Sequence, residues 1–112
     1  MTVIHHASGT QSHTELESGL KALASQRRLQ ILDWLKDPAT HFPPQEHGDH
    51  QDHGACNLFI VDKLGVSQPA GSRHLKILVD AGLILATRRK GWTYYRRNED
   101  AIAYISRQLA II

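Results

Sequence analysis

Residues 65–78, GVSQPAGSRHLKIL, constrain the fold of this 112-residue chain more than any other stretch. Ser67 is of a type that caps helix N-termini, and Pro69 falls in the first turn, where a missing backbone N–H costs little. The pattern predicts a tight turn followed by a helix to about Ala81. Gly82 suits the left-handed position that commonly ends a helix.

The predicted helix over 67–81 has two different faces. Its apolar edge holds Leu75, Leu78 and Val79, which recur at helical spacing and would seat the helix on a core. The other side gathers polar and cationic groups, namely Gln68, Ser72, Arg73 and Lys76. An ordinary amphipathic surface helix shows the same division, so the faces alone do not decide the function.

The net charge of +2 conceals an uneven distribution along the chain. Residues 73–97 contain one acid, Asp80, against a group of basic residues: Arg73, Lys76, Arg88, Arg89, Lys90, Arg96 and Arg97. The segments on both sides are net acidic. Such a basic block favours a polyanion as partner, although a solvated basic face explains the charge equally well.

The first half of the chain has the apolar spacing of helices. Leucines recur at helical intervals over 13–24, and a second helix is predicted from a Ser25 cap to the break at Pro38. Residues 37–57 then form a Pro-, His-, Asp- and Gly-rich loop that is long for a compact domain. A short helix is expected over 58–64, and Gly65 lies just past it, where a helix commonly ends.

The second half ends in a hairpin and a helix. Residues 84–97 predict two strands joined by a turn at Lys90 and Gly91. Asn98 is a suitable cap for a final helix with an apolar stripe, which we expect over 98–112.

Short helix, tight turn, helix and hairpin make up the winged helix-turn-helix arrangement. We therefore expect a mainly α (α+β) fold with about five helices and a two-stranded β wing. The length suits one domain, over 13–112 with the loop inserted at 37–57, after a flexible N-terminus at 1–12. No apolar run could span a membrane and no secretory signal is evident, so we expect no membrane association. Cys56 is the only cysteine, which fits a cytoplasmic protein.

Three segments resemble the ArsR/SmtB family of bacterial transcriptional repressors: LASQRRLQIL, KLGVSQPAGSRHLKILVDAGLI and RRKGWTYYRR. They stand in the family's order and cover roughly residues 16–105, and the middle one is the most specific. The resemblance implies a homodimer that is joined by its N- and C-terminal helices. It also implies a repressor that binds double-stranded DNA at an inverted-repeat operator and is released by an inducer or metal that the sequence does not identify.

The helix and the hairpin tip supply the candidate DNA contacts. A helix fits the major groove, where Gln68 can pair with adenine and Arg73 with guanine or a phosphate. A cationic hairpin tip can enter the neighbouring minor groove or hold its backbone. His74 lies beside the apolar edge of the helix, so a side chain that packs against the core is the alternative to one that contacts a base. The predicted DNA-binding set is Ser67, Gln68, Ser72, Arg73, His74, Lys76, Arg88, Arg89 and Lys90.

The terminal helices carry aliphatic stripes that we expect to form a dimer interface. A small domain with spare apolar helix faces usually buries them against a symmetric partner. The alternative to a dimer interface is that these apolar residues only complete the core of the monomer. The predicted dimerisation residues are Leu16, Leu20, Leu23, Ile102, Ile105, Leu109 and Ile112.

Gly71 departs from the resemblance, because relatives usually carry a branched apolar residue at this position, one turn before Leu75. A glycine there removes a core contact and costs roughly 1 kcal/mol in helix propensity against alanine. Nothing in the sequence accounts for it.

Metal sensing is an alternative to a metal-free regulator. The resemblance matches Cys56 to the first of two metal-binding cysteines, but Leu58 and Phe59 stand at the second cysteine and the acid, so that site cannot form. The loop offers another set at three-residue spacing, His47, His50, His53 and Cys56, which suits zinc, nickel or copper. A solvated His-rich loop is the competing interpretation, and no cofactor is required.

Other function classes are less well supported by the residues. The sequence has no Gly-rich phosphate loop, no nucleophile elbow and no HExxH motif, so we do not expect an enzyme. A winged-helix module that binds a protein partner is the alternative to a DNA-binding regulator. A salt-sensitive association with duplex DNA would distinguish the two.

Overall fold

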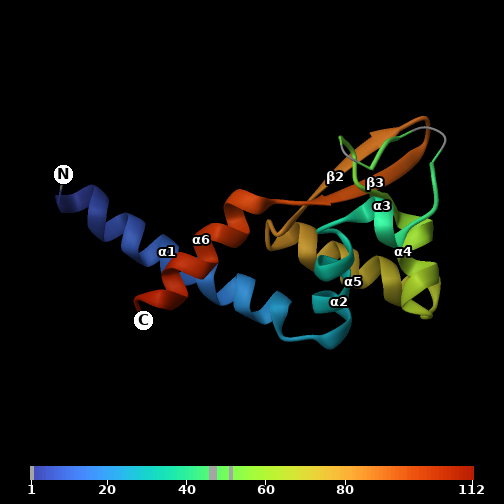
Figure 1. Cartoon of the computed structure of the whole chain (residues 1–112). Helices are drawn as coiled ribbons and strands as arrows, with labels where there is room; N and C mark the ends of the chain where they lie inside the picture. The colour runs from blue at the N-terminus through green and yellow to red at the C-terminus, as the bar shows by residue number, and fades with distance from the viewer. Residues whose placement is uncertain (1, 46–47, 51) are drawn as a thin grey trace.

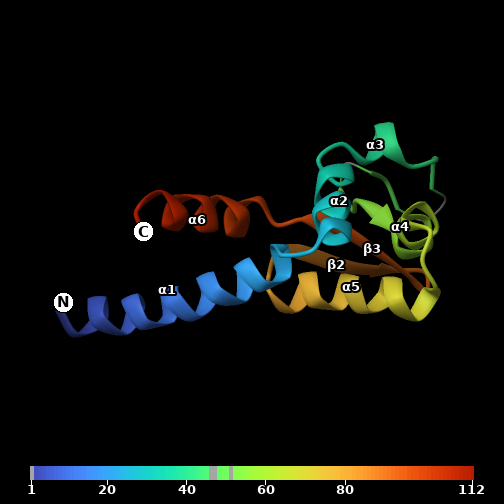
Figure 2. The same cartoon turned by 90° about the horizontal axis from the view of Figure 1, so that it is seen from below.

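The computed structural model describes residues 2–45, 48–50 and 52–112. The first and last helices form an elongated stem, and the other elements form a head at one end of it (Figure 1 and Figure 2). The molecule measures 50 × 25 × 23 Å because the stem extends beyond the head. The elements are α1 (Thr2–Leu23), α2 (Gln26–Trp34), α3 (Pro38–His41), β1 (Ala55–Cys56), α4 (Asn57–Leu64), α5 (Gln68–Asp80), β2 (Ile84–Arg89), β3 (Trp92–Arg97) and α6 (Glu99–Ala110).

The head is a winged helix-turn-helix around one apolar core. α4 and α5 pack against each other, against α2 and against the sheet. Leu75 and Leu78 are buried as predicted, and Val79 is half-buried. The largest fully buried side chains come from every layer of the head: Ile31, Ile60, Leu75, Leu78, Leu83 and Ile84.

The predicted helix ends are confirmed where a local signal marks them. Ser25, Ser67 and Asn98 each accept a hydrogen bond from the backbone N–H three residues on, as N-caps do. Gly65 and Gly82 have φ angles of 70° and 75°, in the left-handed region where α4 and α5 must end. These caps fix the length and direction of α5, the helix that carries the polar face.

α1 is longer than the sequence predicts. It begins at Thr2, so residues 2–12 are helical where a flexible N-terminus was expected. Adding residues to an existing helix gains one hydrogen bond for each residue ordered, so a segment without apolar spacing can continue a helix that other residues nucleate. No helix among the described residues is long and apolar enough to cross a membrane.

The sheet has three strands, in the order β1-β3-β2, rather than the predicted two. β1 runs antiparallel to β3, with Ala55 opposite Tyr95 and Cys56 opposite Tyr94. A two-residue strand has no periodicity of its own, and its partner lies far along the chain, so no sequence pattern marks it. The wing is therefore anchored to the loop as well as to α5.

The 37–57 segment is also more ordered than a simple loop. Pro38 begins α3, which suits its fixed φ and makes six described helices instead of about five. Further on, the side chain of Gln45 holds the segment together. Its Oε1 accepts the N–H of Cys56 at 2.6 Å, and its Nε2 donates to the carbonyl of Gly54 at 2.9 Å.

Candidate nucleic-acid interface

α5 packs against the side chain of Val61 on α4, and Gly71 makes this contact possible. A Cβ at Gly71 would lie 2.5 Å from Cγ2 and 2.7 Å from Cγ1 of Val61, which are distances that side chains do not tolerate. Val61 thus fills the space that a branched side chain at position 71 would need. The sequence alone does not explain Gly71. The structure explains it, because the absence of a side chain there leaves room for Val61 on the neighbouring helix.

The opposite face of α5 is open. Gln68, Ser72, Arg73 and Lys76 are all exposed, and α5 forms an outer edge of the head in Figure 2. Gln68 Nε2 donates to Ser72 Oγ at 3.2 Å, which orients both side chains along the helix. Lys76 pairs with Asp80 at 3.0 Å, so part of its charge is compensated. Arg73 is the other exposed cation on this face.

His74 lies on the side of α5 toward α2 and is half-buried. Its Nδ1 is 3.0 Å from Nη1 of Arg28, and since a guanidinium only donates, Nδ1 is the acceptor. Burial, followed by the charges of Arg28 and Arg73, lowers the pKa of His74 from its usual 6.5. The same Arg28 donates through Nε to the carbonyl of Ala22 at 2.6 Å, so one side chain connects the end of α1 to α5.

The wing tip carries a compact group of cations. β2 and β3 meet in a two-residue turn, Lys90–Gly91, whose φ angles of 52° and 83° match the turn type that suits a twisted hairpin. Arg88 donates to Thr93 Oγ1 and to the Gly91 carbonyl, each at 3.3 Å. Arg88, Arg89 and Lys90 are all exposed. The predicted turn is confirmed, and it presents three positive charges in one place.

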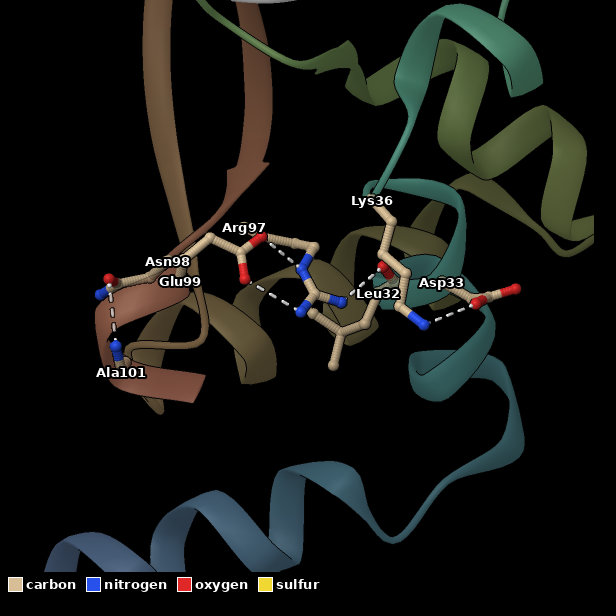
Figure 3. A network of polar contacts seen from close by, with 7 residues as sticks. All are labelled: Leu32, Asp33, Lys36, Arg97, Asn98, Glu99 and Ala101. Carbon is tan, nitrogen blue, oxygen red and sulfur yellow. Dashed lines mark hydrogen bonds and ion pairs between the residues drawn. The ribbon is translucent and has the colours of Figure 1, made fainter. Parts of the chain in front are cut away.

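Arg97 does not belong to this cationic surface, although the sequence counts it in the basic block. Its side chain is only 13% exposed and binds both carboxylate oxygens of Glu99, at 2.8 and 3.1 Å. Its Nη1 donates to the carbonyl of Leu32 in α2 at 3.1 Å, as Figure 3 shows. The hydrogen bond from Arg97 holds the pKa of Glu99 below its usual value. Arg97 therefore fastens the start of α6 to the head.

Comparison with known proteins places this arrangement in a family. Residues 56–85 match the sequence family described as bacterial regulatory protein, arsR family. An uncharacterized HTH-type transcriptional regulator of Bacillus subtilis, YbzH, is 48% identical over 86 residues, which make up 77% of this chain and 86% of that protein. The arsenical resistance operon repressor of Staphylococcus xylosus is 32% identical over 101 residues, or 90% of this chain and 83% of the repressor. The chain belongs to the ArsR family.

The fold of this ArsR-family protein is also found among solved structures. A homodimeric winged helix-turn-helix DNA-binding domain from Mycobacterium bovis matches it with a TM-score of 0.60 and 28% identity, covering 94% of this chain and 82% of that chain. This agreement confirms the predicted fold class.

The aliphatic residues predicted for dimerisation differ in burial and form three groups in this ArsR-family protein. Leu16 and Ile105 are buried within the chain, where they join α1 and α6 to the core. Three others are exposed along the stem: Leu20 at 39%, Leu109 at 40% and Ile112 at 87%. Leu23 and Ile102 are half-buried. Closure of the monomer core therefore accounts for Leu16 and Ile105. It leaves Leu20, Leu109 and Ile112 exposed to solvent.

The two helices of the stem approach each other closely at Gly19. A Cβ at Gly19 of α1 would collide with the side chain of Ile105 of α6. The glycine lets α6 lie directly on α1, which places the exposed leucines of the two helices on a common stem.

The loop residues predicted as metal ligands are not brought together where the structure describes them. His47 lies outside the described residues. His50 Nε2 lies 3.1 Å from the Pro43 carbonyl, whereas His53 accepts a backbone N–H at 3.1 Å. Cys56 is buried, and its thiol donates to the next side chain along. Across the described ranges, no three His, Cys, Asp or Glu side chains form a group that could hold a metal ion.

Three positioning residues were not found from the sequence. Arg28 and His74 are 46 positions apart, and Arg97 and Leu32 are 65 apart, so no local pattern links either pair. Gln45 likewise bonds three backbone groups, at Gly48, Gly54 and Cys56, in a segment with no repeating pattern. Each is a polar side chain that joins two elements, and only the folded chain reveals its partners.

Proposed function

We propose that this ArsR-family protein is a sequence-specific DNA-binding repressor that acts in the cytoplasm as a homodimer on an inverted-repeat operator. The observation that carries this proposal is the open polar face of α5. The helix is capped at Ser67 and wedged against Val61, so its outward side chains are held on a rigid element. A rigid helix with exposed Gln and Arg side chains suits the major groove, which is wide enough to admit it.

The side chains of α5 divide between base edges and phosphates in this proposal. Gln68 and Arg73 face outward and have the geometry to pair with adenine and guanine, respectively. Ser67, Ser72 and Lys76 contact the phosphate backbone, with the contribution of Lys76 reduced by its ion pair to Asp80. We assign His74 a positioning role because its Nδ1 is occupied by Arg28.

The wing extends the contact beyond the major groove. Arg88, Arg89 and Lys90 form an exposed cationic tip at a rigid turn, which is suited to the phosphates or minor groove beside the site read by α5. The homodimer rests on the exposed leucines of the stem. Burial of these residues against a second copy would place two heads on one duplex, about one helical turn apart.

The proposal is tested by incubating the purified full-length protein with fragments of the source genome and sequencing those that it retains. We expect enrichment of an inverted repeat, and an affinity that falls steeply as salt is raised because phosphate contacts release counterions. Retention without sequence preference at moderate salt would contradict an operator-binding regulator. It would favour the protein-interaction module instead.

A further inference from the structure

A pocket of about 220 Å³ lies between the wing and the first turn of α4, away from the outward face of α5. One wall is β3, where Trp92 and Tyr94 point to the same side of the strand because alternate residues share a face. The second wall is formed by Leu58 and Phe59 of α4. The pocket is therefore lined by two elements that the sequence did not place together.

The remaining boundary comes from the segment before α4. Pro44 and Gln45 close the pocket there, and Cys56 contributes to its lining from a position directly opposite Tyr94 in the sheet. The carboxamide of Gln45 is engaged with the backbone at Cys56 and Gly54, so it fixes this wall rather than facing a ligand. The walls are thus held by strand pairing and by hydrogen bonds before any ligand arrives.

The lining defines the chemistry of the occupant. Among the described residues that line the pocket, none is charged, and three of the side chains are aromatic. Leu58 and Trp92 at its mouth are 42% and 40% exposed, which is apolar surface that a ligand would cover. A cavity of roughly 150 Å³ accommodates benzene, so this pocket has room for one substituted ring.

We propose that this pocket binds a small, uncharged molecule with a single aromatic ring. The ring lies against Trp92 and Tyr94 on one side and Phe59 on the other, with Leu58 over its edge. Uncharged ligands are selected because an ion would lose its hydration without gaining a counter-charge from the described lining. The site does not depend on the proposed DNA-binding role, so its failure and the failure of that role are separate outcomes.

The test uses two fluorinated probes that differ in charge, 4-fluorobenzyl alcohol and 4-fluorobenzoate, with the reduced full-length protein. Binding broadens the ¹⁹F resonance of each probe. We expect saturable broadening of the alcohol, with a dissociation constant on the order of a millimolar for a ligand of this size, and at least a several-fold weaker effect on the benzoate. Equal or stronger binding of the benzoate would overturn the proposal, since it would indicate attachment to the basic surface.

Two variants locate the site. Leu58→Lys places a charge at the mouth of the pocket, and Leu85→Lys is its matched control, because Leu85 is 36% exposed on β2 and does not line the pocket. We expect broadening of the alcohol to be lost in the first variant and kept in the second. Since both leucines are exposed, both variants should fold. Equal broadening by both variants would overturn the proposed site.

Cys56 provides a second readout inside the pocket. We expect the alcohol, at a concentration equal to its dissociation constant, to lower the rate of Cys56 alkylation by iodoacetamide about two-fold, because half of the pockets are then filled. The rate is followed by mass spectrometry of the intact protein. An unchanged rate at a concentration that saturates the NMR signal would place the probe elsewhere and overturn the assignment.

Discussion

Val61 of α4 packs directly against the backbone of α5 at Gly71, with no room for a Cβ between the two helices. This contact sets the separation of α4 and α5 and thereby the depth at which α5 stands out from the head. The loss of helix propensity at a buried glycine is offset by this closer packing of Val61, which is only 4% exposed.

The contact between Val61 and Gly71 predicts an unusual effect of an alanine substitution at position 71 on stability. Gly71→Ala normally stabilises a helix, but here it should lower the free energy of unfolding by about 1–3 kcal/mol, because overpacking outweighs the gain in propensity. Urea unfolding measures the change. The control is the double variant Val61→Ala with Gly71→Ala, which should be more stable than the sum of the two single changes implies. A more stable Gly71→Ala protein would refute the close-packing explanation.

Arg73 and Lys90 should differ in what they contribute to operator binding. Arg73→Ala should cost about 1–3 kcal/mol on the operator and reduce the preference for one base pair, as expected for a contact to a base edge. Lys90→Ala should weaken all DNA sequences alike and lower the slope of log affinity against log salt by about 1. Gel shifts with matched and mutated operators over a salt series distinguish these effects. Identical behaviour of the two variants would contradict the division between helix and wing.

His74 should make the stability of the head depend on pH. Its folded-state pKa is lowered from 6.5, chiefly by burial and then by Arg28, so the unfolded chain takes up a proton first as the pH falls. The stabilising contribution is therefore present above about pH 6.5 and is lost as the pH falls toward the lower folded-state pKa. His74→Asn keeps an acceptor for Arg28 without titrating. The stability difference between wild type and variant should shrink across this window, and a constant difference would contradict the mechanism.

The exposed leucines of the stem should control oligomeric state. Leu109→Glu should shift the protein from dimer to monomer in sedimentation equilibrium, because a carboxylate would be buried in an apolar interface. The matched control is Leu85→Glu on β2, which has a similar exposure, 36% against 40%. The control should remain dimeric. A dimeric Leu109→Glu protein would place the interface elsewhere.

Arg97 should matter more for stability than its partner Glu99. Arg97→Gln removes hydrogen bonds from a side chain that is 13% exposed, including the one to Leu32, and should cost about 1–2 kcal/mol. Glu99→Gln alters an ion pair whose carboxylate side is 67% exposed, so we expect about 0–1 kcal/mol. Urea unfolding near neutral pH compares the two. A larger loss in the Glu99 variant would show that the ion pair, and not the bond to α2, secures the junction.

Local signals explain why much of the fold was predictable. Caps at Ser25, Ser67 and Asn98 and left-handed glycines at Gly65 and Gly82 act within a few residues, and all five were correctly identified from sequence alone. The turn at 90–91 was predictable for the same reason. Such signals mark where an element begins or ends through residues that are close to it in the sequence.

The features that the sequence did not predict are contacts between distant segments. β1 exists only because Ala55 and Cys56 lie beside β3, and Arg97, which the sequence counts in the basic block, instead donates to a carbonyl of α2. Gly71 was unexplained because its reason is a side chain on α4. The candidate DNA-binding residues were identifiable by type and spacing. The folded structure was needed to show that Lys76 pairs with Asp80 and that His74 bonds Arg28.

The elongated stem has a mechanical consequence. Arg28 and Arg97 join the head to the stem at two separate points: Arg28 bonds Ala22 of α1 as well as His74, and Arg97 pairs with Glu99 at the start of α6. We therefore expect the head and the stem to move as one body. In a two-fold dimer joined through its stems, a small change in the angle between the two stems would move the outer edges of the two heads apart or together by a much larger distance. A change in the packing of the two stems would thus control whether both heads reach successive turns of a duplex. Neither head would need to rearrange internally.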